Sequence, residues 1–359
     1  MLPIKNIYFY LFLFSLIIIA NYYGSKIKTL FEKEEKTEEY NLIKNYLLND
    51  SPLYGFNKPK LWIHTKYELN SRKWKDFYSR NSTDLNQPYI HLTIKTIIDH
   101  CADDFHICLI DDESFSRLIP SWDVYLPSIA EPMKTHFREL AFTQILYYYG
   151  GMFVPNSFVC NKNLLPLYLD GIRMKTPFIC ESVNHNENKA KHHIRLNFIP
   201  SIYFMGAEKN HPVILEFVEF IKKRNRFPHF TSENDFLGDI SEWCIDSIRN
   251  GNMKLIDGSL IGIKNDKRKS ISIEELTEED YLHLDDSCYG VYIPSDEFLN
   301  RTKYQWFAVM SSQELLASKM IISSYIKSSM VDSYKKQVPV IASHDGSSSA
   351  TKIKSIIAL

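Results

Sequence analysis

Polar residues follow three stretches that the sequence predicts to be buried strands. His64 ends the first, Asp111 and Asp112 follow the second, and Asn156 and Ser157 come shortly after the third. In an open α/β sheet the ligand lies beyond the carboxyl ends of the strands. The adjacent carboxylates offer charged oxygen atoms, which hard divalent cations require as ligands. These five positions therefore mark the expected binding site.

Each of these residues also has a structural interpretation. His64 suits a hydrogen-bonded core histidine, because it ends an apolar run. Asp111 and Asp112 suit caps of a short helix that would continue to Leu118. The residue types alone leave both interpretations open.

The surrounding elements must position these side chains. Apolar runs predict strands at 60–64, 105–110, 152–154, 177–181 and 201–205, followed by hairpin-like strands up to 294. Apolar residues at helical spacing predict helices at 88–101, 133–149, from 212, at 235–249 and at 315–330. Gly150 is expected to end the second helix in a left-handed conformation. Alternating strands and helices favour a three-layer α/β fold with a parallel sheet.

The N-terminal run 7–23 is almost wholly apolar. As a helix it spans about 26 Å, close to the thickness of a thin bilayer. We therefore expect a single-pass signal anchor over 1–25, with the folded part lumenal or extracytoplasmic, and alternatives are a cleaved signal peptide and a buried helix. A charged stalk at 26–58, a domain at 59–330 and a flexible tail at 331–359 complete the predicted organisation.

Composition narrows the class of partner. Of the 359 residues, 45% are hydrophobic and 24% are charged, which is typical of globular proteins. The net charge is −1 with no dense basic segment, so a nucleic-acid partner is not expected. The six cysteines contain no C-x-x-C pair. Buried free thiols are therefore favoured over disulfides, and a structural zinc site is not expected.

Three segments resemble a known family. The opening strand at 59–64, the stretch 146–154 with its double glycine, and Met205-Gly206-Ala207 followed by His211-Pro212 are similar to GT-A glycosyltransferases with a sugar-binding region. That family includes initiating mannosyltransferases and capsular sugar transferases. The resemblance covers roughly 59–225 and implies a GT-A-like, Rossmann-type mixed sheet flanked by helices. It also implies a nucleotide sugar and a glycan or lipid acceptor as partners.

In this family the double glycine leads into an Asp-x-Asp motif. The two carboxylates hold a divalent cation that neutralises the nucleotide diphosphate. Here the corresponding positions are Pro155 and Ser157, with Asn156 between them. No metal ligand is therefore predicted at the motif, and Mn²⁺ or Mg²⁺ would need other carboxylates.

Substitutes for the motif come from neighbouring elements. Asp111, Asp112 and Glu181 are the candidates for cation binding and catalysis. Arg138 and Glu139 occupy helix positions that the resemblance assigns to the nucleotide-sugar site, together with His64, Asn156 and Ser157. Arg138 could pair directly with phosphate. The structural alternative for Arg138 and Glu139 is a surface ion pair.

Two functions from different classes follow. The first is a membrane-anchored enzyme that transfers a sugar from a nucleotide-sugar donor to a glycan or lipid. The second is a non-catalytic GT-A-like pseudoenzyme with a binding or structural role, because a fold alone does not confer activity. The double-glycine stretch favours the first, and the replaced carboxylates favour the second.

Overall fold

A computed structural model of the chain describes residues 58–65, 87, 89–182, 198–226 and 233–337. Six strands form a mixed sheet in the order β2-β1-β3-β6-β5-β7, and β4 pairs with β8 in a separate small sheet. The strands are β1 (Lys60–His64), β2 (His106–Ile110), β3 (Gly151–Phe153), β4 (Phe158–Cys160), β5 (Phe178–Ser182), β6 (Ile199–Ala207), β7 (Lys254–Ile256) and β8 (Gly290–Tyr292).

The helices connect these strands and cover the sheet. The α-helices are α2 (Ile90–Cys101), α3 (Phe115–Leu118), α4 (Met133–Tyr149), α5 (Leu165–Gly171), α7 (Pro212–Arg226), α8 (Glu233–Arg249), α9 (Ile273–Thr277), α10 (Ser295–Asn300), α11 (Gln305–Ala308), α12 (Ser312–Ala317) and α13 (Ile321–Gln337). Short 3-10 helices lie at η2 (Leu126–Ser128), η3 (Gly258–Ile261) and η4 (Thr302–Tyr304).

The sheet reverses its strand order at β1. This strand pairs in parallel with β2 on one side and with β3 on the other. The chain passes from β1 through α2 to β2, and then through α4 to β3. Trp62 lies between Cys108 of β2 and Phe153 of β3. Such a switch point opens a crevice beyond the carboxyl ends of the two diverging strands.

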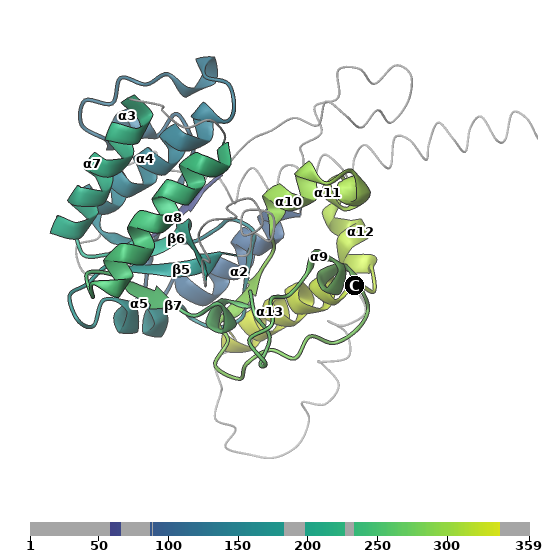
Figure 1. The fold of residues 1–359 in the computed structure, drawn as a ribbon. Coiled ribbons are helices and arrows are strands. Elements are labelled where there is room, and N and C mark those ends of the chain that lie inside the picture. The colour runs from purple at the N-terminus through teal and green to yellow at the C-terminus, as the bar shows by residue number, and fades with distance from the viewer. Residues whose placement is uncertain (1–57, 66–86, 88, 183–197, 227–232, 338–359) are drawn as a thin grey trace, which may run out of the picture.

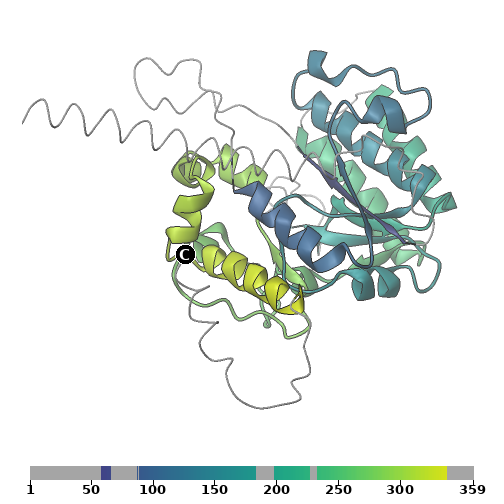
Figure 2. The same cartoon turned by 180° about the vertical axis from the view of Figure 1, so that it is seen from behind.

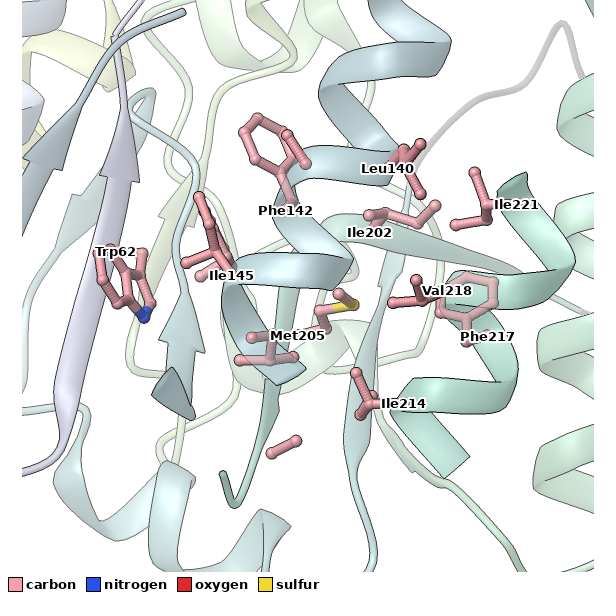
Figure 3. Close-up of a cluster of buried hydrophobic side chains, with 14 of the residues drawn as sticks. Trp62, Leu140, Phe142, Ile145, Ile202, Met205, Ile214, Phe217, Val218 and Ile221 are labelled. Atoms are coloured by element: carbon pink, nitrogen blue, oxygen red, sulfur yellow. The ribbon is translucent and has the colours of Figure 1, made fainter. Parts of the chain in front are cut away.

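Alternate residues of β1 enter two different hydrophobic clusters. Trp62 packs in the cluster that the sheet forms with α4, α7 and α8 (Figure 3). Figure 1 shows these helices along one face of the sheet. Leu61 and Ile63 pack on the opposite face, with α2 and α5. This alternation is expected of a strand whose two faces are both buried. The mixed sheet flanked by helices that the resemblance implies is therefore confirmed. The prediction of a parallel sheet, favoured by the alternation of strands and helices, is wrong, because β6 pairs antiparallel with both β3 and β5.

The double glycine brings β3 close to its neighbours. Gly150 has a φ of +68° and Gly151 has a φ of +96°, which L side chains rarely adopt. A β-carbon at Gly151 would lie 2.1 Å from the carbonyl oxygen of Lys60. The predicted positive φ of Gly150 is confirmed, but its ψ of −167° is not that of a left-handed helix. Glycine is needed here so that α4 can end directly beside β1.

The C-terminal helices α9 to α13 form a third cluster. They pack on α2 and on the small sheet of β4 and β8, beside the main sheet in Figures 1 and 2. Phe298, Phe307 and Ile326 are fully buried there. The C-terminal part of the chain thereby closes one side of the crevice at the end of β1.

Two predictions for the C-terminal half are wrong. Of the expected hairpin-like strands before residue 294, the structure has only an isolated antiparallel bridge between Lys264 and Ser270. The strands of this region pair elsewhere, β7 in parallel with β5 and β8 with β4. The single helix predicted at 315–330 is divided into α12 and α13. Ser311 starts α12 with a capping box, and α13 continues past residue 330 to Gln337.

The predicted anchor, stalk and last part of the tail lie outside the described residues. Among the helices that are described, none is both long and apolar enough to cross a membrane. All six cysteines lie within the described ranges, where they are buried and free. The prediction of buried thiols is therefore confirmed for this structure.

Candidate functional site

A pocket lies where the strand order reverses. Its walls come from the carboxyl ends of β1 and β3, from α4 and β6, from the start of α2, and from β8 and α10. The lining residues are His64, Gln87, Ile90, Phe142, Phe153, Val154, Pro155, Asn156, Ser157, Tyr203, Tyr292, Ser295, Asp296 and Leu299. The pocket therefore joins the predicted strand ends with residues more than a hundred positions further along the chain.

His64 ends β1 and is held on three sides. Its ring stacks on Phe115 at a centroid distance of 5.5 Å and meets the edge of Phe142 at 5.0 Å. Its Nε2 lies 2.9 Å from Oδ1 of Asp112. The aromatic contacts and the carboxylate fix the orientation of the imidazole, which suits a hydrogen-bonded core histidine as well as a site residue.

Asp112 is the centre of a charged network behind His64. Arg138 of α4 donates from Nε to Oδ1 at 2.9 Å and from a terminal nitrogen to Oδ2 at 2.7 Å. The other terminal nitrogen of Arg138 donates to Glu131 at 3.0 Å. Burial disfavours the charged form of Asp112, but the hydrogen bonds with His64 and Arg138 outweigh it and hold its pKa well below the usual range. Asp112 therefore stays ionised in the folded protein.

Arg138 and Glu139 do not form a surface ion pair. Both side chains lie on α4 and are buried, with exposed fractions of 4% each. Arg138 instead forms ion pairs with Asp112 and Glu131. Neither residue belongs to the pocket wall. The expected pairing of Arg138 with a phosphate therefore has no geometric support in the described site.

Asp111 and Asp112 point to different partners. Asp111 Oδ1 accepts from the backbone nitrogen of Ser114 at 2.9 Å and from its hydroxyl at 2.6 Å. This closes the turn that leads into α3. The formal cap of α3 is Ser114, which makes no side-chain capping bond. Asp111 thus stabilises the turn, and only Asp112 contacts the pocket residue His64.

Asn156 and Ser157 line the pocket, but each is bound to a neighbouring element. The carbonyl oxygen of Asn156 accepts from the Thr93 hydroxyl at 2.5 Å. The Ser157 hydroxyl donates to the carbonyl oxygen of Ile293 at 2.7 Å, and the Ile293 nitrogen donates back to Ser157 at 3.1 Å. Ser157 is 1% exposed. Its hydroxyl therefore holds β4 and β8 of the small sheet together at the edge of the pocket.

Glu181 lies elsewhere on the sheet. Its Oε1 is 2.5 Å from Nζ of Lys264, and its Oε2 accepts from the backbone nitrogen of Gly258 at 3.1 Å. It is 5% exposed and does not line the pocket. Glu181 therefore ties η3 to β5, and the structure does not bring it to the other predicted site residues.

The residues present do not fit a carboxylate-held cation. Within the described ranges, no group of three or more His, Cys, Asp or Glu side chains could hold a metal ion. Pro155 has no ligand atom in its side chain, and the Ser157 hydroxyl is engaged with Ile293. Asp111, Asp112 and Glu181 are each bound to other partners. The predicted substitution of the missing motif by these acids is therefore not supported.

Sequence reasoning missed five polar residues of the pocket. They are Gln87, Tyr203, Tyr292, Ser295 and Asp296. Asp296 sits in the first turn of α10, where an acidic residue is common for helix stability alone. No spacing in the sequence connects α10 with β1, because the pairing of β4 with β8 creates this proximity.

Comparisons with known proteins give little further information. No protein-family model matches the chain, and no curated protein matches it. One similar solved structure is described as "PaToxG Glycosyltransferase", with 14% identity over 62% of this chain and 80% of that chain, at a TM-score of 0.33. A likeness this weak carries no argument about function. The mixed sheet itself is consistent with a glycosyltransferase-like fold.

Proposed function

We propose that this chain is a glycosyltransferase-like protein that binds a sugar-containing ligand in the pocket beyond β1 and β3. The observation that carries the proposal is the position of that pocket at the reversal of strand order, directly after the double glycine. Ligands of open α/β sheets bind at such points. Because the described residues include no group of three or more His, Cys, Asp or Glu side chains that could hold a cation, binding is expected to be independent of Mn²⁺ and Mg²⁺.

Filling the pocket tests this proposal. Isothermal calorimetry would measure the Kd of UDP-glucose, UDP-N-acetylglucosamine, GDP-mannose and the free sugars, with and without Mn²⁺. Ser295→Trp places a large ring on the pocket wall and should abolish binding. The matched control is Ser116→Trp, at an exposed position of α3 that does not line the pocket. The proposal would be contradicted if none of these ligands gave a measurable heat of binding, or if both variants bound a ligand equally well.

Sugar transfer from a nucleotide-sugar donor to a glycan or lipid acceptor is the second candidate. It is favoured by the stretch 146–154, whose double glycine leads β3 to the pocket as the family resemblance implies. Pro155 and Ser157 argue against it, because proline has no ligand atom in its side chain and the Ser157 hydroxyl donates to the carbonyl oxygen of Ile293. Release of UDP or GDP from the same donors, measured with and without Mn²⁺, distinguishes the two functions. Cation-dependent release would favour the transferase over a protein that only binds.

Membrane attachment is part of the proposal and is supported by the apolar run 7–23 alone. We expect a single span, with the folded domain lumenal or extracytoplasmic. Carbonate extraction of the full chain should leave it in the membrane fraction. Recovery of full-length protein in the supernatant would contradict the anchor without affecting the ligand pocket.

A further inference from the structure

The helix α2 and the strand β4 are joined along a seam that starts at the pocket. At the pocket end, the Thr93 hydroxyl donates to the carbonyl oxygen of Asn156 at 2.5 Å. Further along, the backbone nitrogen of Cys160 donates to the Thr96 hydroxyl at 3.0 Å. Asn156 lines the pocket, and so does Ile90 at the start of α2. The relative position of α2 and β4 therefore sets part of the pocket wall.

Two thiols lie at the far end of this seam. Cys101 is the last residue of α2, and Cys160 is the last residue of β4. Their sulfur atoms lie 3.9 Å apart, inside the hydrophobic cluster on that face of the sheet. A disulfide has a sulfur–sulfur length of about 2.05 Å, so rotation of the two side chains and a small shift of the element ends would form it. The pair is thus placed to cross-link α2 to β4.

Both cysteines are fully buried, but each lies next to an exposed turn. Asp103 comes two residues after Cys101, and Lys162 comes two residues after Cys160, and both are exposed. The Cys160 thiol donates to the carbonyl oxygen of Lys162 at 3.1 Å, so opening of that turn uncovers the sulfur. Element ends open at a lower free energy than the core, which gives a small oxidant access to the pair.

The four other cysteines provide controls for this pair. Burial raises the pKa of Cys108, Cys180, Cys244 and Cys288 above the ordinary value of a thiol. The thiolate is the form that attacks a disulfide, so these four thiols are expected to exchange slowly.

We propose that Cys101 and Cys160 form a reversible disulfide that locks α2 to β4 and stiffens the pocket wall at Asn156. The oxidant is a small disulfide such as oxidised glutathione. One cysteine thiolate attacks it, forms a mixed disulfide and releases one glutathione. The second cysteine then attacks the protein sulfur of the mixed disulfide and releases the other glutathione. The two electrons and two protons lost by the protein thiols are thereby held by the two glutathione thiols. The cross-link does not depend on which ligand the pocket takes.

A redox titration of the full chain tests this proposal. The protein is equilibrated with mixtures of reduced and oxidised glutathione, then denatured and alkylated, and its intact mass counts the thiols. The reduced protein should take up six alkyl groups, and the oxidised protein should take up two fewer. The oxidised protein should also melt about 5 °C higher, because the cross-link joins residues 59 positions apart. Reduction with dithiothreitol should reverse both changes.

Cys101→Ala and Cys160→Ala should each remove the cross-link and the rise in melting temperature, whereas Cys108→Ala should retain both. Hydrogen exchange of the peptide spanning 156–160 should be about threefold slower in the oxidised protein, while peptides of α8 should be unchanged. Six alkylated thiols at every glutathione ratio would overturn the proposal, and so would a peptide map that pairs other cysteines. Equal exchange at 156–160 in the two forms would overturn the stiffening of the pocket wall.

Discussion

Asp112 and Arg138 form a two-pronged ion pair, with distances of 2.9 Å and 2.7 Å between the guanidinium nitrogens and the two carboxylate oxygens. The same carboxylate contacts His64 at 2.9 Å. A residue after β2, a residue of α4 and the last residue of β1 are thereby linked into one network behind the pocket. The network places the imidazole, while its charges largely neutralise one another.

Replacing Asp112 by Asn should destabilise the fold. Arg138 would remain buried with only Glu131 to balance its charge, so we expect a loss of about 2 to 4 kcal/mol in the free energy of unfolding. Urea unfolding at pH 7 measures this change. Asp123→Asn, at an exposed position, is the control and should change stability by less than about 0.5 kcal/mol.

The ion pair of Asp112 with Arg138 also predicts that the free energy of unfolding depends on pH in the acid range. Because the pKa of Asp112 is depressed in the folded state, its contribution is fully present above the ordinary value of 3.8 and is lost as the pH falls below it. Unfolding free energies measured from pH 5 down to pH 2 should therefore fall more steeply for the wild type than for Asp112→Asn. Parallel curves would contradict the ionised pair.

A methyl group at Gly151 should prevent normal folding. The added carbon would lie 2.1 Å from the Lys60 carbonyl oxygen, and the φ of +96° is itself unfavourable for alanine. We expect Gly151→Ala to cost more than about 4 kcal/mol or to yield insoluble protein. Gly251→Ala is a matched control, because Gly251 also has a positive φ, of +73°, but nothing lies within 4 Å of its added carbon. It should cost only about 1 to 2 kcal/mol.

The fold was predictable where a local pattern and a local stop signal coincide. The bounds of α4 at 133–149 follow from helical spacing ended by Gly150, and β1 follows from an apolar run after a proline. The small sheet was not predictable in the same way. Its strands β4 and β8 have three residues each, and their partners are separated by more than a hundred residues. Nothing local distinguishes such strands from loops.

The site was predictable only in part for a related reason. The rule for strand ends pointed to His64 and Asn156, and both line the pocket. It could not show that Arg138 is buried against Asp112, because burial depends on how α3 and α4 pack. Asp296 was missed because α10 reaches the pocket only after the C-terminal helices have assembled.

Cys101 and Cys160 should form a disulfide when the protein is oxidised. Their sulfur atoms lie 3.9 Å apart in the cluster between α2 and β4, close enough that a small shift permits a bond of about 2.05 Å. Treatment of the folded protein with diamide, followed by peptide mass spectrometry, should recover the Cys101–Cys160 cross-link. Cys101→Ser removes one partner and should abolish it. Absence of this peptide in the oxidised wild type would contradict the geometry.

Replacing Glu181 by glutamine should lower the stability of the fold and leave ligand binding unchanged. Lys264 would lose the carboxylate that lies 2.5 Å from its Nζ, so stability should fall by about 1 to 3 kcal/mol. Ligand binding should be unchanged, because Glu181 does not line the pocket. Calorimetry with a pocket ligand and thermal melting give the two readouts, with the exposed Glu279→Gln as control. A folded Glu181→Gln variant that has lost binding would restore Glu181 to the site.

Rebuilding the Asp-x-Asp motif should fail at Ser157. Pro155 lies partly exposed on the pocket wall, so Pro155→Asp alone should be tolerated. Ser157 is 1% exposed and its hydroxyl donates to the carbonyl oxygen of Ile293, so a carboxylate there would face another acceptor. We expect Ser157→Asp to cost about 3 to 5 kcal/mol, against about 1 kcal/mol for Ser157→Ala, which loses only one hydrogen bond.

Melting temperatures of the three single variants and of Pro155→Asp/Ser157→Asp check this order, and calorimetry with Mn²⁺ checks the metal. The double variant should bind no more Mn²⁺ than the wild type, because the buried side chain at position 157 faces the carbonyl oxygen of Ile293, where a carboxylate is disfavoured. A stable double variant that binds Mn²⁺ and UDP together would contradict this expectation and show that the end of the small sheet can reorganise around a carboxylate at position 157.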